Sequence, residues 1–408
     1  MYIPVSFECN SPEQCPCLPR RRESPTSTAV SSLPRRPEAP VPPRLRSQDR
    51  SAQRLTEHDA TRTLSRDAVA SFRHRFPSSA LPLIAHTARQ FRSLHTMAVP
   101  TLPLSDGTQI PSLAWGNGTG DAKKTATESG RLAIKVGIRH IDTAQGYENE
   151  KETGESIAIA EKDNGIKAGE IYLTTKLSTE KGDPTNPGIS LEELRHSVRG
   201  SLQRLGRQPN LVLIHNPFVP PKGKLVEFWK ILEEMKDKGE LTASLGVSNF
   251  RPQDFEELLP HCKYPPVVNQ LEYHPYVLTH LQPVLDIMEK HNIRVESYGG
   301  LSPLLRHPTG GPIKPLLEKV AARLSKESGK DVDAAMALIL WQRSKGVVVV
   351  TASGNAERIE KLSLTQELPD LTKEDVDEIE SVGRKIHYRA YDEHMCVDFP
   401  APDLPKDA

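Results

Sequence analysis

The residues best suited to catalysis in this 408-residue sequence are an aspartate, a tyrosine and a lysine. They lie near the ends of two consecutive apolar segments. Asp142 ends one apolar run, Tyr147 follows five residues later, and Lys176 ends the next run. A tyrosine donates a proton efficiently near neutral pH only if a nearby cation lowers its pKa from about 10, and a carboxylate must hold that cation. The three residues therefore predict proton transfer to a substrate. Taken singly, an aspartate at such a place is more often a helix cap or a turn residue.

Eight apolar segments, separated by amphipathic ones, predict the elements that position these residues. The expected strands are Ser112–Gly116, His140–Thr143, Ile171–Lys176, Leu211–His215, Ala243–Val247, Val267–Leu271, Arg294–Tyr298 and Val347–Val350. Helical periodicity fills the intervals, as in residues 225–238 and in 190–205, where Ser190 and Glu193 form a capping box. Strands alternating with helices over about 270 residues predict a (β/α)8 TIM barrel. Residues 101–110, with Asp106-Gly107 at their centre, predict a β-hairpin in front of the barrel.

Polar or aromatic side chains follow nearly every expected strand. The carboxyl ends of the strands in such a barrel meet at one mouth, where the catalytic residues gather. By chance, several unrelated strands would rarely each end in a group suited to the same reaction, so we expect the residues that follow the strands to form one site. They are Asp142, Tyr147, Lys176, His215, Ser248, Asn249, Asn269, Gln270, Tyr298 and Ser353.

These motifs resemble the aldo-keto reductases over nearly the whole of residues 98–390. The resemblance rests on Asp142-Thr143-Ala144 with Tyr147, Thr175-Lys176, Leu213-Ile214-His215, residues 246–250, residues 268–275 and Glu357-Arg358-Ile359. Residues 296–303 are most similar to the fungal branch that includes NADPH-dependent α-keto amide reductases. An oxidoreductase that reduces aldehyde or ketone carbonyls to alcohols is therefore implied, with α-keto amides or esters, small sugars and aldehydes as candidate substrates.

The resemblance implies a role for each matched residue. Tyr147 would be the general acid while hydride arrives from NADPH, Lys176 paired with Asp142 would lower the phenol pKa, and His215 would orient the carbonyl. The residues implied in cofactor binding are Ser248, Asn249 and Gln270 at the carboxamide, Tyr298 stacked on the nicotinamide, and Ser353, Asn355 and Arg358 at the 2′-phosphate. A second function is implied for the same fold, that of a cofactor-binding regulatory or redox-sensing subunit with little turnover.

Two departures from the family pattern concern the cofactor and the substrate pocket. Thr351-Ala352-Ser353 stands where relatives often have Pro-Lys-Ser, so NADPH remains the expected cofactor but with a smaller margin over NADH. Gly118-Thr119-Gly120 stands where many relatives have a tryptophan, which predicts a wider pocket. The run Gly116-Asn117-Gly118-Thr119-Gly120 does not form a Rossmann fingerprint, because Asp121 occupies the last glycine position.

Three segments are expected along the chain. Residues 1–96 contain 15 arginines, no lysine and 8 acidic residues, a net charge of +7, and they are rich in Pro and Ser. Such a composition predicts a disordered extension. It is either a targeting segment, since residues 71–92 resemble a mitochondrial presequence, or an artefact upstream of a true start at Met97. Residues 97–386 are expected to form the barrel. Residues 387–408 form a tail whose Tyr388, Tyr391, His394 and Phe399 either line the pocket or pack on the barrel.

The cysteines and the apolar segments indicate which metals, compartments and partners to expect for the protein. The spacing of the five cysteines, of which Cys262 and Cys396 belong to the folded part, matches neither a zinc site nor a disulfide framework, so we expect no metal and a reducing compartment. No segment has the roughly 20 apolar residues of a membrane span. We expect a cytoplasmic monomer or weak dimer that binds a small carbonyl substrate, without nucleic-acid or membrane partners; mitochondrial targeting is the minor alternative.

Overall fold

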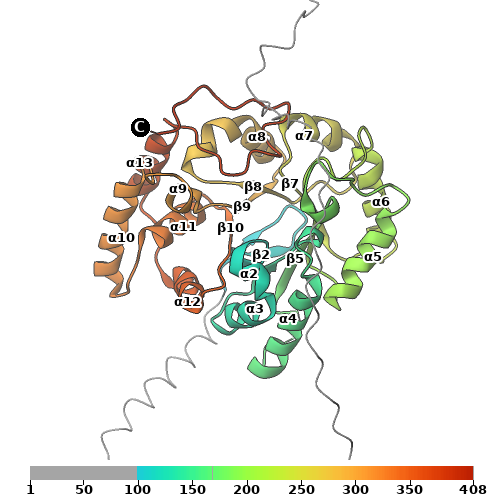
Figure 1. The fold of residues 1–408 in the computed structure, drawn as a ribbon, viewed down its shortest axis with the longest axis horizontal. Helices are drawn as coiled ribbons and strands as arrows, with labels where there is room; N and C mark the ends of the chain where they lie inside the picture. The colour runs from blue at the N-terminus through green and yellow to red at the C-terminus, as the bar shows by residue number, and fades with distance from the viewer. Residues whose placement is uncertain (1–98, 168, 408) are drawn as a thin grey trace, which may run out of the picture. The chain divides into compact units, whose positions relative to one another are not determined.

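A closed barrel of eight parallel strands forms the centre of the protein in a computed structural model, which describes residues 99–167 and 169–407 (Figure 1). The strand order is β10-β3-β4-β5-β6-β7-β8-β9. All eight predicted strands are confirmed to within one residue at each end: β3 (Leu113–Gly116), β4 (His140–Asp142), β5 (Tyr172–Leu177), β6 (Leu211–Ile214), β7 (Ser244–Ser248), β8 (Val268–Glu272), β9 (Arg294–Tyr298) and β10 (Val348–Thr351).

The register of the parallel strands brings the predicted site residues toward one end of the barrel. Gly116 of β3 is paired with Asp142 of β4, and Lys176 of β5 is paired with Leu213 of β6. On the other side of the barrel, Gln270 of β8 is paired with Ser248 of β7. Because every strand runs in the same direction, Gly116, Asp142, Ser248 and Gln270 all reach the mouth at the carboxyl ends of the strands.

A β-hairpin closes the opposite end of the barrel. Strands β1 (Thr101–Pro103) and β2 (Gln109–Pro111) pair antiparallel, as predicted, and Gly107 takes a φ of 86° in the turn between them. Leu104 and Ile110 of this hairpin are buried against Leu211 and Val268, which stand at the starts of their strands. The hairpin thus seals the amino-terminal end of the barrel and leaves the chemistry to the other end.

Helices surround the barrel on its outside (Figure 1). The predicted helix at 225–238 is confirmed as α6. Ser190 and Glu193 make the predicted capping hydrogen bonds, at 2.9 Å between the side chains and 3.3 Å from the Glu193 N–H, but the helix itself begins only at Leu194. The helices are α2 (Gly120–Lys124), α3 (Ala126–Lys135), α4 (Glu150–Asn164), α5 (Leu194–Leu205), α6 (Leu225–Asp237), α7 (Pro252–Leu258), α8 (Leu278–Lys290), α9 (Ser302–Leu305), α10 (Lys314–Ser328), α11 (Ala334–Ser344), α12 (Ala356–Leu364) and α13 (Lys373–Gly383).

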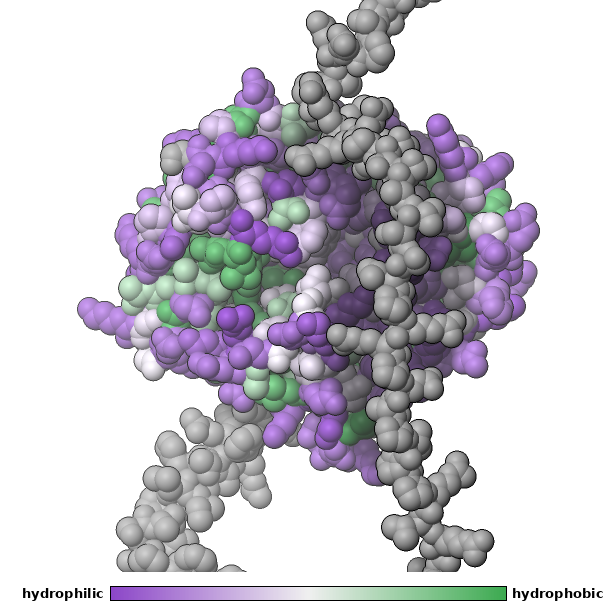
Figure 2. Space-filling view, viewed as in Figure 1, coloured by the Kyte–Doolittle hydropathy of each residue, from purple (hydrophilic) through white to green (hydrophobic). Residues whose placement is uncertain are grey.

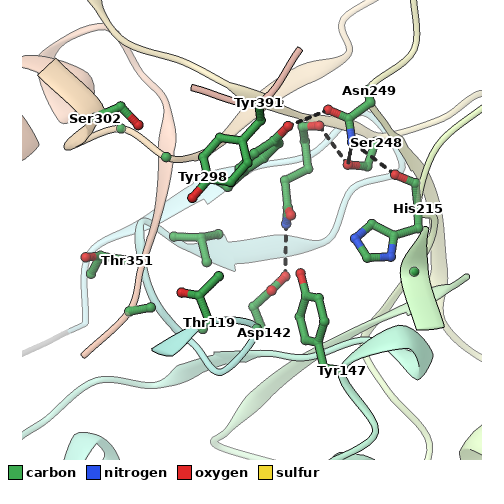
Figure 3. Close-up of a pocket in the computed structure, with 18 of the residues that line it drawn as sticks. Thr119, Asp142, Tyr147, His215, Ser248, Asn249, Tyr298, Ser302, Thr351 and Tyr391 are labelled. Atoms are coloured by element: carbon green, nitrogen blue, oxygen red, sulfur yellow. Dashed lines mark hydrogen bonds between the residues drawn. The ribbon is translucent and has the colours of Figure 1, made fainter. Parts of the chain in front are cut away.

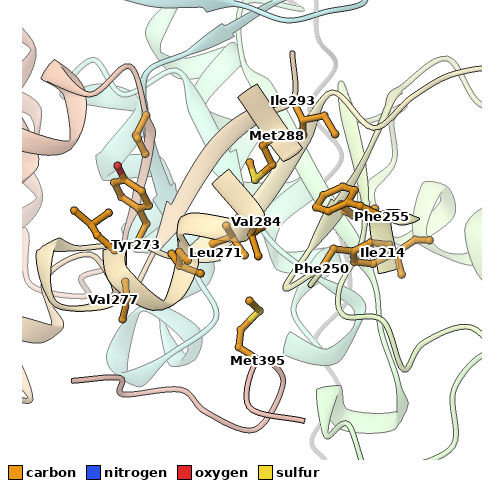
Figure 4. Close-up of a cluster of buried hydrophobic side chains, with 14 of the residues drawn as sticks. Ile214, Phe250, Phe255, Leu271, Tyr273, Val277, Val284, Met288, Ile293 and Met395 are labelled. Atoms are coloured by element: carbon orange, nitrogen blue, oxygen red, sulfur yellow. The ribbon is translucent and has the colours of Figure 1, made fainter. Parts of the chain in front are cut away.

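The main hydrophobic core lies between the strands and these helices. Figure 4 shows Leu271 of β8 beside Val284 and Met288 of α8, and Met395 of the carboxyl-terminal tail next to the same cluster. Burying one such side chain stabilises a fold by roughly 1.5–3 kcal/mol. Met395 therefore helps to hold the tail, residues 387–407, on the barrel.

Several predictions concern residues outside the described part of the chain. These are the disordered extension over residues 1–96, the presequence-like segment and the start at Met97. Within residues 99–167 and 169–407, no helix is both long and apolar enough to cross a membrane. In the same ranges, no cluster of three or more His, Cys, Asp or Glu side chains is arranged to hold a metal ion.

Candidate active site

A cavity of about 400 Å³ opens at the carboxyl ends of the strands, where the sequence predicted the site (Figure 3). Seven of the predicted residues line it: Asp142, Tyr147, His215, Ser248, Asn249, Gln270 and Tyr298. Lys176 is completely buried behind Asp142 and Tyr147 and contacts both. The structure thus brings the four predicted catalytic side chains together from β4, the turn after it, β5 and the end of β6.

Lys176 connects the acid to the phenol. Its Nζ atom donates to Asp142 Oδ1 at 2.5 Å and to the backbone carbonyl of Thr143 at 3.1 Å. The hydroxyl of Tyr147 lies 3.2 Å from the same Nζ atom. Because Tyr147 lies on a single 3-10 turn, η3 (Gln145–Tyr147), directly after β4, the short connection places its hydroxyl near the strand end that carries Asp142.

Burial has the largest effect on the pKa values of Tyr147 and Lys176. Burial raises the pKa of Tyr147 above its ordinary value, and the Lys176 ammonium acts against that shift without reversing it. Lys176 lowers the phenol pKa as expected, but the net shift is upward and the expected net lowering is wrong, since enclosure disfavours the phenolate more than one ammonium favours it. Burial lowers the pKa of Lys176, but its pairing with Asp142 and Tyr147 outweighs burial, so this pKa is raised. The site holds a protonated phenol beside a charged amine.

A second buried acid, which the sequence analysis assigned to no role, lies in the barrel below this group. Glu296 of β9 is fully buried, with Gln270 and His140 as polar neighbours of its carboxyl group. One of its carboxyl oxygens lies 3.7 Å from His140 Nε2. Burial and the nearby Asp142 raise the pKa of Glu296 to about 8. The acid is therefore mostly neutral at pH 7.

His215 follows directly after β6, on the other side of the Tyr147 ring. The centroids of the two rings are 5.5 Å apart, and the rings meet edge to face. Burial, together with Lys176 and His394, holds the pKa of His215 well below its ordinary value. A neutral imidazole next to the phenol can donate a hydrogen bond to a carbonyl oxygen bound between them.

The opposite wall of the cavity is a connected set of amide and hydroxyl groups. Asn249 donates to the carbonyl of His215 at 3.1 Å and to Ser248 Oγ at 3.1 Å, and it accepts from the Tyr298 hydroxyl at 2.8 Å. Ser248 donates in turn to the carbonyl of Gln270 at 2.9 Å. Asn249 has a left-handed backbone, with φ of 59°, that asparagine tolerates better than most residues. These bonds fix the orientation of the three side chains.

The three residues expected at a 2′-phosphate lie outside the lining of this cavity. Thr351 and Ala352 line it, whereas Ser353 and Asn355 follow on the loop leading into α12 and Arg358 lies in the first turn of that helix. Asn355 caps that helix by accepting from the Arg358 N–H at 3.0 Å, and both side chains are exposed. Trp115 of β3 donates to the carbonyl of Ser353 at 2.9 Å and ties the loop to the barrel.

The carboxyl-terminal tail both lines the pocket and packs on the barrel, the two alternatives that the sequence left open. Tyr391 and His394 line the cavity, whereas Phe399 stacks on His280, with centroids 4.3 Å apart, and Tyr388 packs edge to face on His307. Glu272 anchors the tail, because its carboxylate accepts the N–H groups of Ala390, at 2.8 Å, and Tyr391, at 3.2 Å.

Further cavity residues come from residues 299–312, a segment expected from its length to close over the substrate, and from elements to which the sequence analysis assigned no role. The segment after β9 contributes Gly299, Gly300, Leu301, Ser302, Leu305 and Arg306, of which Ser302 and Leu305 lie on α9. Lys123 lies on α2, Lys181 on a turn after β5 and Glu393 on the tail. Gly118 lies directly against the Tyr147 ring, since a Cβ atom there would be 2.6 Å from the ring. Space near Gly118 is thus filled by the tyrosine itself. Thr119, in the stretch where many relatives carry a tryptophan, lines the cavity with a small side chain.

Comparisons with known proteins agree with this geometry. Residues 112–384 match the model of the aldo/keto reductase family. The NAD/NADP-dependent indole-3-acetaldehyde reductase of Schizosaccharomyces pombe is 33% identical over 299 residues, which are 71% of this chain and 97% of that protein. The crystal structure of an aldo/keto reductase from Brucella melitensis (31% identity, TM-score 0.58) covers 70% of this chain and 100% of its own. That of a Bombyx mori aldo-keto reductase in complex with NADP (26% identity, TM-score 0.62) covers 76% and 99%. This chain therefore belongs to the aldo/keto reductase family.

Proposed function

We propose that this protein reduces aldehydes and ketones to alcohols, with NADPH as its preferred cofactor and Tyr147 as its general acid. The observation that carries the proposal is the convergence of Asp142, Tyr147, Lys176 and His215 on one cavity. The reaction adds one hydride to the carbonyl carbon and one proton to the carbonyl oxygen. A reductase of this kind needs both a proton donor and a place for a hydride donor.

The cavity wall made by Ser248, Asn249, Gln270 and Tyr298 fits a nicotinamide cofactor. Its amide and hydroxyl groups match the donors and acceptors of a carboxamide, and the Tyr298 ring offers an aromatic face. A bound nicotinamide supplies the hydride. NADP(H) is supported by the S. pombe relative, which is named as NAD/NADP-dependent, and by the NADP complex of the B. mori relative.

Tyr147 supplies the proton in this proposal. The Lys176 ammonium at 3.2 Å offsets part of the effect of burial on the phenol pKa, and it stabilises the phenolate that remains once a substrate oxygen has accepted the proton. Asp142 keeps that ammonium in place. General acid catalysis of this kind contributes about 10²–10⁴-fold to a rate.

His215 orients the carbonyl group. Because its imidazole is neutral, it does not compete with Tyr147 as an acid; it can donate one hydrogen bond to the substrate oxygen. A preorganised donor at this position stabilises the negative charge that develops on the oxygen as hydride arrives.

The mouth of the cavity suits a substrate with both polar and apolar parts. Arg306 lies over the Tyr391 ring at 4.8 Å, and Glu393 and His394 stand close by in the tail. Beside them, Figure 2 shows hydrophobic side chains gathered over α9, where Leu305 is 73% exposed. α-Keto amides and esters, which have a polar group next to the ketone, are the substrates we place first, followed by small sugars and aldehydes.

Steady-state oxidation of NADPH with a panel of carbonyl compounds tests the proposal. We expect turnover with at least one class of the panel, a higher kcat/KM with NADPH than with NADH, and one alcohol formed for each NADPH consumed. Binding of NADPH without turnover across the whole panel would instead support the second function of the fold, a regulatory or redox-sensing subunit.

We also propose that the barrel over residues 97–386 and its tail act without residues 1–96, as a monomer or weak dimer in the cytoplasm. A chain starting at Met97 should then match the full chain in melting temperature and in specific activity. A large loss of either quantity would show that the preceding segment contributes to the enzyme, and mitochondrial import of the full chain would support the targeting alternative.

A further inference from the structure

Ser178 contacts the ring nitrogen of His215 that is not needed for substrate binding. Its Oγ atom lies 2.7 Å from His215 Nδ1, and its side chain is buried, one residue beyond the end of β5. We propose that Ser178 is a positioning residue that fixes the proton of His215 on Nε2, the form able to donate to the substrate carbonyl. This inference rests on the proposed role of His215 in the reaction.

The tautomer of His215 decides what its imidazole can do. A neutral imidazole carries one N–H, so one nitrogen donates and the other accepts. If the proton sat on Nδ1, it would point at Ser178, and Nε2 would offer only a lone pair, which repels a carbonyl oxygen. A second proton is not available, because burial and the charge of Lys176 hold the pKa of His215 well below its ordinary value. The site therefore works only with the proton on Nε2.

The distances favour the Ser178 hydroxyl as the donor of this bond. A separation of 2.7 Å suits either an O–H or an N–H donor, so the direction of the bond depends on what else the hydroxyl can donate to. The other acceptor within reach of the hydroxyl is the carbonyl of Lys176, at 3.4 Å, which is the weaker choice. With the hydroxyl directed at Nδ1, that nitrogen must be the acceptor, and the proton of the ring must be on Nε2.

Ser178 is itself held by an outer set of hydrogen bonds. Its backbone N–H donates to Gln145 Oε1 at 3.1 Å, and the Gln145 amide donates to the hydroxyl groups of Ser197 and Ser201 of α5, each at 2.9 Å. A second cavity, of about 340 Å³, reaches Ser178 from this side. Without the serine hydroxyl, water from this cavity could contact Nδ1. Water both donates and accepts, so it would not select one tautomer.

Ser178→Val and Ser178→Thr form a matched pair for the test, because the two side chains have nearly the same shape and only threonine keeps a hydroxyl. We expect Ser178→Val to lower kcat roughly tenfold, a fraction of the 10²–10³-fold that removal of a whole oxyanion donor costs. The dissociation constant of NADPH should stay the same, and Ser178→Thr should keep most of the rate. An equal loss in both variants would overturn the proposal, since it would point to packing.

The full chain with ¹⁵N-labelled histidine gives a reading that does not depend on turnover. The ring resonances of His215, identified by their loss in His215→Gln, should show an unprotonated Nδ1 and a protonated Nε2 in the wild type, and averaged values in Ser178→Val. A protonated Nδ1 in the wild type would refute the inference even if Ser178→Val did not fold. Absence of turnover in the wild type would instead refute the proposed function.

A double-mutant cycle with His215 is the third test of the proposal. Glutamine has no tautomers, so Ser178→Val should have no further effect on kcat when it is added to His215→Gln. Additive losses would mean that Ser178 acts on the reaction by some route other than His215, and the proposal would fail.

Discussion

Gln270 of β8 donates a hydrogen bond to Asp142 of β4, across the mouth of the barrel, at 2.9 Å between Nε2 and Oδ2. The two oxygens of Asp142 are thus divided between Lys176 and Gln270. A residue expected to hold the cofactor carboxamide therefore also holds the acid that positions the ammonium. Occupation of the cofactor wall and orientation of the proton donor are linked through this one amide.

Replacing the proton donor should separate binding from reaction. Tyr147→Phe keeps the ring that lies against Gly118 and His215 but removes the hydroxyl. We expect kcat to fall by about 10²–10⁴-fold, the usual contribution of general acid catalysis, with little change in NADPH affinity. Quenching of tryptophan fluorescence measures that affinity, because Trp115 contacts the Ser353 loop. Near-normal turnover in this variant would show that another group donates the proton.

Glu296 should make the stability of the fold depend on pH. Its pKa is about 8 in the folded protein, against about 4.3 in an unfolded chain, because the buried acid is favoured in its neutral form. Between these two values the folded state binds more protons than the unfolded state, so this acid's contribution to stability is fully present below about pH 4.3 and is lost as the pH rises toward 8.

Glu296→Gln has nearly the same shape and no titration. Relative to the wild type, we expect the variant to gain free energy of unfolding progressively from about pH 5 to pH 8, with the difference constant at higher pH. Denaturant titrations at several pH values measure it. The groups around the acid, His140, Asp142, Lys176 and Tyr172, are unchanged in the variant. A difference that did not vary with pH would mean that Glu296 is ionised throughout.

The barrel and the catalytic residues at its strand ends could be predicted from the sequence, because both follow from the order of apolar segments along the chain. Each apolar run is one strand, and in a parallel barrel the residue at its end must face the mouth. Asp142, Lys176 and His215 could therefore be placed together without knowledge of distant contacts.

The remaining parts of the site depend on contacts far apart in the sequence. The tail reaches the cavity through Glu272, more than a hundred residues before Tyr391, and no periodic pattern in residues 387–407 indicates such an anchor. Ser178 gave no signal either, because a serine two residues after a lysine is common and its partner comes from the next strand. The raised pKa of Tyr147 could not be predicted for a similar reason, since the charges in a sequence do not show how deeply a side chain is buried.

Cofactor selectivity should depend on Arg358. With Ala352 in place of the expected lysine, Arg358 is the cation that the loop from 351 to 358 offers to a 2′-phosphate. Arg358→Ala should weaken NADPH about tenfold to a hundredfold, the range for hydrogen bonds between charged groups, and leave NADH almost unchanged. Ala352→Lys should strengthen NADPH selectively. Fluorescence titration of both cofactors measures these changes, and equal losses for NADH and NADPH in Arg358→Ala would assign the arginine to support of the loop.

Removing the charge of Glu272 should loosen the tail. The carboxylate is fully buried and pairs with Arg389, at 3.3 Å, whose side chain is only 2% exposed. Breaking a buried pair by removing one partner commonly costs about 3–5 kcal/mol, because the other charge is left uncompensated. In Glu272→Gln we therefore expect the tail to detach in preference to burying the lone arginine, which would move Tyr391 and His394 out of the cavity.

Three measurements follow for Glu272→Gln: faster proteolysis within residues 387–407, a lower melting temperature and a higher KM for the carbonyl substrate. The double variant Glu272→Gln/Arg389→Gln is the control, since it removes both charges and keeps side chains that can hydrogen-bond across the same interface. We expect it to recover part of the lost stability and of the protection from protease. If the single variant kept the protease resistance and KM of the wild type, the hydrophobic contacts of Met395 and Phe399 would be sufficient to hold the tail, and the anchoring role of Glu272 would be wrong.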